Sequence, residues 1–259
     1  MFVPAFWMPS PNFGDALTPW LIRRISGKPV AFVEPNAGFK HLVICGSVLN
    51  HASSNAIVWG AGLANFGDDV NPKADIRAVR GPMTWKKAIA CNNPAPHVLG
   101  DPAMLLPELY DSPRPQHWNV GFVPHFKDQA HVLYLAGQIL VNAGVLPINV
   151  LDSVEGVVDR IRSCKMIVSS SLHGLIVAHA YGIPAVWANF GADIGGDGFK
   201  FWDYFALVGL NGISPIALHD LTDIPAVLTL CAGRITLPAT KFDTSGLWAS
   251  CPMERISAT

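Results

Sequence analysis

The alternation of short apolar runs with helical segments is the feature that most restricts how this chain can fold. One clear case is the buried run KMIVS, which leads directly into a helical segment that Gly182 closes. Repeated strand–helix alternation is typical of a parallel sheet with helices on both faces. The sequence therefore predicts an α/β fold.

The pattern also gives approximate bounds for the elements. The expected strands are Phe2–Met8, His41–Cys45, Ala56–Trp59, Ile76–Val79, His97–Leu99, Asn119–Val123, Pro147–Leu151, Met166–Ser169 and Ala185–Ala188. The expected helices are Asp15–Ile25, one that begins with Met83–Trp85, Gln129–Ala143, Val154–Ser163, Leu172–Tyr181 and Phe201–Gly209. Ligands of such sheets bind beyond the carboxyl ends of the strands, so the residues that follow each strand are the candidates for a site.

A proline-bearing stretch, YDSPRPQ, interrupts the pattern after Leu109. The strand–helix pattern restarts beyond it. We therefore expect two Rossmann-like domains with parallel sheets, at residues 1–112 and 118–259, joined by a linker at about 110–118.

Composition excludes several classes of protein. Only 14% of the residues are charged and the formal net charge is −1, so neither disorder nor nucleic-acid binding is expected. The five cysteines are scattered and form no CxxC pair, which indicates reduced thiols in a cytoplasmic protein rather than disulfides or a zinc site. The apolar stretch His131–Leu151 contains Gln138 and Asn142 and is divided by Gly144 and Pro147, which favours a buried helix and strand over a membrane span.

The strongest candidate site is the segment SSSLHG, which joins a strand to a helix. Ser170 or Ser171 would cap that helix, and the free N–H groups of its first turn favour an anion. His173 and Gly174 complete the segment. The alternative is a serine cap with an incidental histidine. His179, six residues on, falls on the apolar face and is expected in the core or at an interface.

A second candidate is Arg80, at the end of a strand before Gly81-Pro82. A guanidinium there could bind a carboxylate or phosphate through two hydrogen bonds. The alternative is an ordinary surface arginine. The nearby Gly60-Ala61-Gly62 resembles the start of a dinucleotide-binding loop, but Asn65 stands where the third glycine is required, so nucleotide binding there is not expected.

Four segments together resemble one family. MPSPNFGDALTPWLI, VWGAGL followed by IRAVRGPMT, LGDPAMLLP, and VSSSLHGLIVAHAYGIPAV have the order found in polysaccharide pyruvyl transferases. With GSVL before VWGAGL, the chain is most similar to the ketal pyruvyl transferases of xanthan- and succinoglycan-type exopolysaccharide assembly. The resemblance covers roughly Pro9 to Leu210.

That resemblance implies a glycosyltransferase-B-like (GT-B-like) fold, with an N-terminal acceptor domain and a C-terminal donor domain. It implies transfer of an enolpyruvyl group from phosphoenolpyruvate to a sugar hydroxyl, with release of phosphate. The sequence contains no cluster of metal-ligating residues, and cationic side chains can serve this mechanism, so no metal or other cofactor is expected. The acceptor would be a lipid-linked exopolysaccharide repeat unit or a related glycan. A cytoplasmic enzyme would then meet such an acceptor at the inner face of the inner membrane.

The chain departs from the family pattern at Ser171, where many relatives have arginine. Another cation would have to contact the donor instead. The candidates are Arg80, His125, Lys127 and Lys200.

The chemistry needs an acid for the methylene carbon of phosphoenolpyruvate, and histidine suits that role near neutral pH. We therefore expect His173 as general acid, Arg80 as a donor ligand and Asp15 as the base for the acceptor hydroxyl; Asp15 could equally be an ordinary first-turn carboxylate. The expected substrate-binding residues are Asn12, Gly14, Ser170, Ser171, Gly174, His125, Lys127 and Lys200.

Two other classes of function stay open. One is a glycosyltransferase that uses a nucleotide-sugar on the same fold. The other is a non-catalytic saccharide-binding module, which would bind glycan but release no phosphate.

Overall fold

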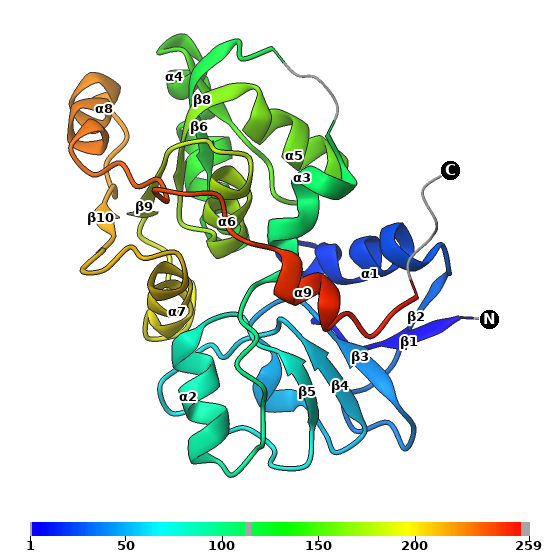
Figure 1. The fold of residues 1–259 in the computed structure, drawn as a ribbon. Coiled ribbons are helices and arrows are strands. Elements are labelled where there is room, and N and C mark those ends of the chain that lie inside the picture. The colour runs from blue at the N-terminus through cyan, green and yellow to red at the C-terminus, as the bar shows by residue number, and fades with distance from the viewer. Residues whose placement is uncertain (1, 112–114, 255–259) are drawn as a thin grey trace. The chain divides into compact units, whose positions relative to one another are not determined.

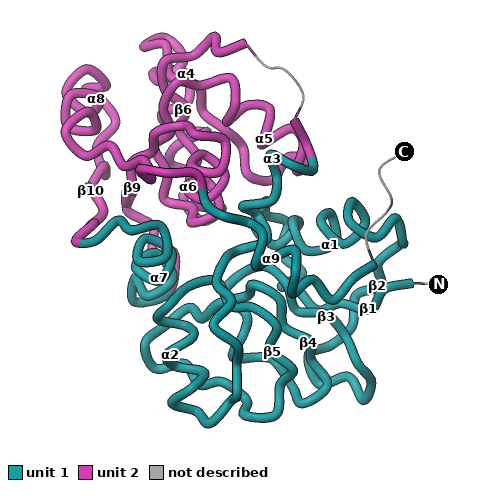
Figure 2. The backbone as a smooth tube through the Cα atoms, viewed as in Figure 1, with its two compact units in different colours: residues 1–109, 196–211, 242–259 teal, residues 110–195, 212–241 magenta. Residues whose placement is uncertain are grey.

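The fold is taken from a computed structural model, which describes residues 2–111 and 115–254. The backbone divides into two compact units (Figure 2). Unit 1 comprises residues 1–109, 196–211 and 242–259, and unit 2 comprises 110–195 and 212–241. The division differs from the expected domains because two later segments group with unit 1. Of the expected linker, residues 112–114 lie outside the described residues.

Unit 1 contains a five-stranded parallel sheet with the order β2-β1-β3-β4-β5 (Figure 1). Its strands are β1 (Val3–Ala5), β2 (Val30–Phe32), β3 (His41–Val43), β4 (Ala56–Trp59) and β5 (Asp75–Ala78). Its α-helices are α1 (Phe13–Ser26), α2 (Pro82–Ala90), α3 (Leu106–Leu109), α7 (Phe199–Leu207) and α9 (Ser245–Ala249).

Helix α1 has well-defined signals at both ends. The side chain of Asn12 accepts hydrogen bonds from the N–H groups of Gly14 and Asp15, as an N-cap residue does. Gly27 ends the helix with a φ of 67°, which a residue with a Cβ adopts only at a cost. Between these ends, Leu17 and Leu21 are fully buried, so the expected amphipathic helix is confirmed.

One face of the unit 1 sheet forms a core with two helices from distant parts of the sequence. Val43 and Val58 are register partners and point to the same face. They belong to one buried cluster with Ala88 of α2 and Phe199 of α7. Helix α7 is therefore part of unit 1, although a strand of unit 2, β9 (Ala185–Asn189), precedes it in the sequence.

Unit 2 contains a second five-stranded parallel sheet, with the order β10-β9-β8-β6-β7. Its strands are β6 (Trp118–Val123), β7 (Val145–Pro147), β8 (Cys164–Ser169), β9 (Ala185–Asn189) and β10 (Ile216–Ala217). Its helices are a π-helical segment (Ala130–Leu135), α4 (Gly137–Asn142), α5 (Val154–Arg162), α6 (Leu172–Ala180) and α8 (Ile224–Ala232).

Helices cover both faces of the unit 2 sheet. Phe122, Val168 and Val186 are neighbours across three strands and share a core with Leu140 of α4 and Val227 of α8. Helices α5 and α6 pack against the strands from the opposite face and against each other. Two parallel sheets of this kind confirm the expected α/β class, while the GT-B classification stays a prediction.

The two sheets share one strand order. In each unit the first strand lies between the second and the third, and the fourth and fifth follow outward. This is an order of doubly wound sheets, in which the crevice between the first and third strands binds ligands at the carboxyl ends. The loops after β1 and β3, and those after β6 and β8, therefore hold the switch-point positions.

Several expected elements differ from those observed. His97–Leu99 forms no strand; Leu99 makes a single isolated bridge with Val79. The strand expected at Pro147–Leu151 begins earlier, at Val145, because Gly144 adopts a φ of 74° and ends helix α4 directly before it. The helix expected over 129–143 is divided into the π-helical segment and α4.

In the part of the chain that the structure describes, no helix combines the length and the apolar character that a bilayer span requires.

Candidate active site

The start of α1 places Asp15 at the carboxyl edge of the unit 1 sheet. Its carboxylate accepts hydrogen bonds from the hydroxyl of Ser10 and from the side-chain amide of Asn12. The other carboxylate oxygen faces Gly46, where a Cβ would lie 3.7 Å away. Asp15 is thus a first-turn carboxylate that also sits at the switch point between β1 and β3, and Asn12 and Gly14 adjoin it.

The same edge contains a buried thiol. Cys45 directs its Sγ at Asp101 Oδ1, 3.2 Å away. Burial, followed by the charge of Asp101 and a smaller contribution from Asp15, raises the pKa of this thiol well above its usual range. Cys45 is therefore a protonated donor, and all five cysteines are free, as expected.

Arg80 is fully buried, so the interpretation as a surface arginine is wrong. Its Nε lies 3.1 Å from Asp203 Oδ2, and its terminal nitrogens lie 2.9 Å from Ser47 Oγ and 2.6 Å from the Leu63 carbonyl oxygen. Each nitrogen of the guanidinium thus donates to a protein group. Its role as a donor ligand stays a prediction, but the contacts are those of a structural arginine.

Lys200, another candidate cation, lies on α7 in unit 1. Its Nζ is 5.4 Å from the centre of the Phe201 ring, within the range of a cation–π contact. The structure therefore places Lys200 and Arg80 in unit 1 and the other two candidate cations, His125 and Lys127, in unit 2.

In unit 2, strand β8 leads into α6 through SSSLHG, as expected. Ser171 occupies the N-cap position, but in the described structure its side chain makes no capping hydrogen bond. Its own N–H donates to Ser169 Oγ over 3.0 Å. His173 lies in the first turn of α6 and is buried. In this structure the Ser171 hydroxyl therefore does not cap the first turn of α6.

Ser170 belongs to a buried network with Asp128. Its hydroxyl donates to Asp128 Oδ2 over 2.6 Å and accepts from the His125 N–H over 2.8 Å. The second oxygen of Asp128 accepts from the Ala192 N–H over 3.0 Å. One carboxylate thus connects the loops that follow β6, β8 and β9.

The loop after β6 also holds Lys127. Its Nζ donates to the Asp193 carbonyl over 2.9 Å, and its N–H donates to His125 Nδ1 over 3.3 Å. His125, Lys127 and Ser170 are therefore brought together at the switch point between β6 and β8. All three were expected to bind substrate, and that role stays a prediction.

Gly174 has a packing role that does not depend on a ligand. A Cβ at this position would lie 2.4 Å from Ser169 Oγ and 2.9 Å from a methyl carbon of Val123. Glycine therefore allows α6 to pack closely against the ends of β6 and β8.

His179 is buried in the interior of unit 2, which confirms the expectation. Its Nε2 lies 3.1 Å from the Thr236 carbonyl oxygen. Burial lowers the pKa of this imidazole to about 4 despite that hydrogen bond. His179 is therefore neutral at physiological pH.

Two buried carboxylates, Asp128 and Asp203, were not among the expected site residues. Asp128 follows an expected strand by a few residues, and a search of that loop for buried acids could have found it. Asp203 is the one acidic residue in the aromatic helix FKFWDYFAL, which is a signal for a buried charge with a partner.

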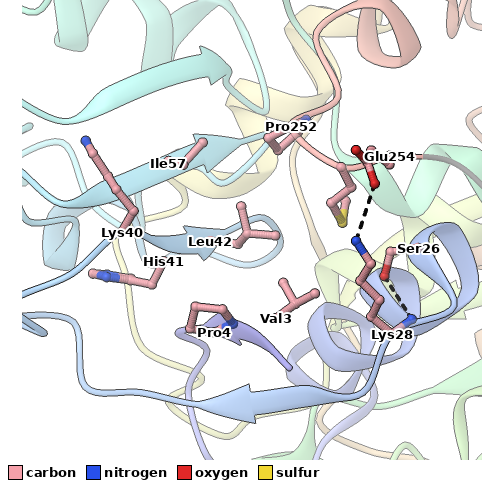
Figure 3. A pocket seen from close by; sticks show the side chains of 11 residues that line it. Val3, Pro4, Ser26, Lys28, Lys40, His41, Leu42, Ile57, Pro252 and Glu254 are labelled. Atoms are coloured by element: carbon pink, nitrogen blue, oxygen red, sulfur yellow. Dashed lines mark hydrogen bonds and ion pairs between the residues drawn. The ribbon is translucent and has the colours of Figure 1, made fainter. Parts of the chain in front are cut away.

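A separate pocket lies at the amino ends of the unit 1 strands (Figure 3). Val3, Leu42 and Ile57 contribute to its apolar lining. The ion pair between Lys28 and Glu254, 3.4 Å apart, is exposed beside it. The pocket is at the opposite edge of the sheet from Asp15, so it is not part of the candidate active site.

The sequence of this chain matches that of a known protein family. Residues 6–189 match the family described as polysaccharide pyruvyl transferase, which is more than half of the chain. The chain belongs to the polysaccharide pyruvyl transferase family. The matched region includes Asp15, Arg80 and His173 and ends with β9, so Lys200 lies beyond it.

Two relatives are each 30% identical to this chain. One is an uncharacterized protein of Acanthamoeba polyphaga mimivirus, aligned over 77% of this chain and 72% of the relative. The other is the succinoglycan biosynthesis protein ExoV of Rhizobium meliloti, aligned over 77% of this chain and 62% of the relative. A solved structure of a functionally uncharacterized Klebsiella pneumoniae protein aligns with a TM-score of 0.48 and 11% identity, over 84% of this chain and 92% of that one.

Proposed function

We propose that this polysaccharide pyruvyl transferase transfers the enolpyruvyl group of phosphoenolpyruvate to a glycan, where protonation of its methylene carbon and addition of two sugar hydroxyls convert it into a pyruvyl unit. The product is a pyruvate ketal and the leaving group is phosphate. The observation that carries the proposal is the family match over residues 6–189, which includes the switch-point loops of both sheets. The name of the relative ExoV supports an exopolysaccharide repeat unit as the acceptor, which we propose is lipid-linked.

In the proposed reaction, His173 gives a proton to the methylene carbon of phosphoenolpyruvate. The carbon that bears the phosphate becomes oxocarbenium-like, and a first sugar hydroxyl attacks it while Asp15 accepts the hydroxyl proton. The C–O bond to phosphate then breaks, phosphate leaves with the bonding electrons, and a second hydroxyl adds to complete the ketal. Each hydroxyl loses one proton, and one proton enters the new methyl group.

The donor is an anion with a carboxylate and a phosphate, so it needs N–H groups and cations. In unit 2 the first turn of α6 supplies N–H groups, and Lys127, next to His125, supplies a cation. We propose that this edge binds phosphoenolpyruvate and that the edge around Asp15 in unit 1 binds the acceptor. The GT-B-like classification and the cytoplasmic location, at the inner face of the inner membrane, belong to the same proposal.

A phosphate-release assay tests the proposal. The protein is incubated with phosphoenolpyruvate and a panel of lipid-linked or synthetic mannosides and galactosides, and a reaction without acceptor is the control. We expect acceptor-dependent phosphate release, and proton NMR of the product should show a methyl singlet without vinyl signals, as a ketal requires. Addition of EDTA should leave the rate unchanged.

The alternatives give different results in the same assay. Turnover of a nucleotide-sugar, without phosphate release from phosphoenolpyruvate, would identify a glycosyltransferase. Binding of glycans with neither activity would identify a saccharide-binding module. Either result would overturn the proposal.

A further inference from the structure

Asp203 of α7 caps a helix that lies far from it in the sequence. Helix α2 begins at Pro82, and its N-cap residue, Gly81, has no side chain to accept the first N–H groups. Asp203 Oδ1 instead accepts the N–H groups of Met83 and Thr84, each over 2.9 Å. A carboxylate at a helix N-terminus pairs with free N–H groups and with the positive end of the helix dipole.

The other oxygen of Asp203 holds Arg80. Arg80 Nε and the Thr84 hydroxyl donate to Oδ2 over 3.1 and 2.7 Å. From there the planar guanidinium extends to Ser47 Oγ in the loop after β3 and to the Leu63 carbonyl in the loop after β4. One fully buried ion pair thus joins α7, α2 and two loops at the carboxyl edge of the sheet.

Two glycines of the family-like motifs leave space for this pair. A Cβ at Gly62 would lie 2.3 Å from the central carbon of the Arg80 guanidinium. A Cβ at Gly81 would lie 2.3 Å from the carbonyl oxygen of Asp203 and 2.5 Å from its Oδ1. All three distances are far below van der Waals contact. The second glycine of GAG and the glycine of RGP are therefore explained by the Arg80–Asp203 pair.

The loop that Arg80 holds lies next to the proposed base. Gly46 O accepts the Gly62 N–H over 2.9 Å, and Gly62 O accepts the Leu49 N–H over 3.0 Å. The position of a Cβ on Gly46 would be in contact with Asp15 Oδ1. A shift of the loop at residues 46–49 would therefore change the surroundings of the Asp15 carboxylate.

We propose that Asp203 is a positioning residue of the transferase. Through Arg80 it fixes the loop at residues 46–49 beside Asp15, and through the cap of α2 it holds α7 in unit 1. The effect on the reaction rests on the proposed function, because it acts through the base role given to Asp15. The effect on the loop does not depend on any substrate.

Amide hydrogen exchange tests the effect on the loop. Asp203→Asn keeps an acceptor for the α2 N–H groups but removes the charge that holds Arg80. We expect exchange of the Leu49 and Gly62 amides to rise about tenfold or more, in line with the loss of a charged hydrogen bond. The matched control is Asn93→Ala, which removes two buried hydrogen bonds elsewhere in unit 1, to the carbonyls of Asn71 and Ala74. It should destabilise the fold without this local increase.

Kinetics test the effect on the reaction. In Asp203→Asn, kcat should fall while the KM for phosphoenolpyruvate stays within about twofold, because the proposed donor groups lie in unit 2. In Asn93→Ala, kcat of the folded fraction should be unchanged. Equal losses of kcat in the two variants would show a merely structural role and overturn the positioning proposal.

Ser47→Ala keeps the proposal testable if Asp203→Asn does not fold. It removes one acceptor of Arg80 and leaves the ion pair intact, and we expect faster exchange at Leu49 and Gly62 only. Unchanged exchange at both amides would overturn the proposal. If the wild-type protein shows no turnover of phosphoenolpyruvate, the proposed function fails, while the exchange results still decide whether Asp203 positions the loop.

Discussion

The hydroxyl of Ser170 donates to the carboxylate of Asp128 over 2.6 Å, and both side chains are buried in unit 2. Ser170 also accepts the His125 N–H, so its hydrogen and a lone pair are both used within the protein. The serine was expected to bind substrate. Its contacts show that it also orients the loop that carries His125 and Lys127.

Ser170→Ala should reduce the free energy of unfolding by about 1–3 kcal/mol, because it leaves Asp128 Oδ2 and the His125 N–H without the serine in a buried site. Urea unfolding followed by circular dichroism measures the change. Ser163→Ala is the control: its hydroxyl donates to the Arg160 carbonyl in an exposed position, so the change should stay within about 0.5 kcal/mol. Equal stabilities of the Ser170 variant and wild type would contradict the network.

Arg80→Lys should destabilise unit 1 by about 1–3 kcal/mol, because one ammonium cannot reproduce the fork that reaches Asp203, Ser47 and Leu63. The KM for phosphoenolpyruvate should stay within about twofold, because the proposed donor groups lie in unit 2; a larger rise would show that Arg80 is the donor ligand that the sequence predicted. The two effects separate in a comparison of urea unfolding with the KM for the donor.

Arg77→Lys is a matched control from β5, the strand that precedes Arg80. Arg77 pairs with Asp75 through two nitrogens, but the pair is exposed to solvent and contributes little to stability. A loss of stability in the Arg77 variant as large as in the Arg80 variant would show that burial is not the cause.

Much of the fold could be predicted because its elements carry their own signals. The strand β4 was expected at the bounds observed, since its apolar run ends at a glycine. The edge strands β2 and β10 were missed; they have three and two residues, too few to show a hydrophobic period. Helix α7 packs in unit 1, where Asp203 accepts the N–H of Met83 at the start of α2. The two residues are 120 positions apart, so no local sequence pattern could predict this contact.

The sequence could predict which residues lie at the carboxyl ends of the strands, but not which partners their side chains contact. Polar residues after strands identified Asp15 and Ser170, because parallel strands end at one edge of a sheet. The same rule could not tell a ligand-binding side chain from one used inside the protein. Arg80 shows the difference: its place at a strand end was correct, but its partner lies on a helix much later in the chain.

Stability should depend on pH through His179. Burial lowers the pKa of this imidazole to about 4 in the folded state, against about 6.5 when unfolded. The unfolded chain therefore binds the proton more readily, and stability rises with pH. The part of the free energy of unfolding that depends on a neutral His179, about 3 kcal/mol at most, is fully present above pH 6.5 and is lost as the pH falls toward 4.

Urea unfolding of wild type and His179→Gln between pH 7 and 4 measures that contribution. Glutamine can donate to the Thr236 carbonyl but does not titrate. We expect the variant to be less stable than wild type at pH 7. The difference between their free energies of unfolding should narrow as the pH falls, because only wild type loses stability through protonation of residue 179. A difference that stays constant across this range would contradict the lowered pKa.

His173→Gln should reduce kcat for acceptor-dependent phosphate release by about 10²–10⁴, the usual contribution of a general acid, because glutamine cannot deliver a proton near neutral pH. Donor affinity and thermal stability should change much less, since Ser171 and the N–H groups of the first turn of α6 remain. His179→Gln is the control on the same helix, with the opposite pattern of lower stability and retained kcat in the folded fraction. If both variants lose stability and neither loses kcat selectively, His173 is only a buried residue of α6, and the acid must be sought at His125 or Asp15.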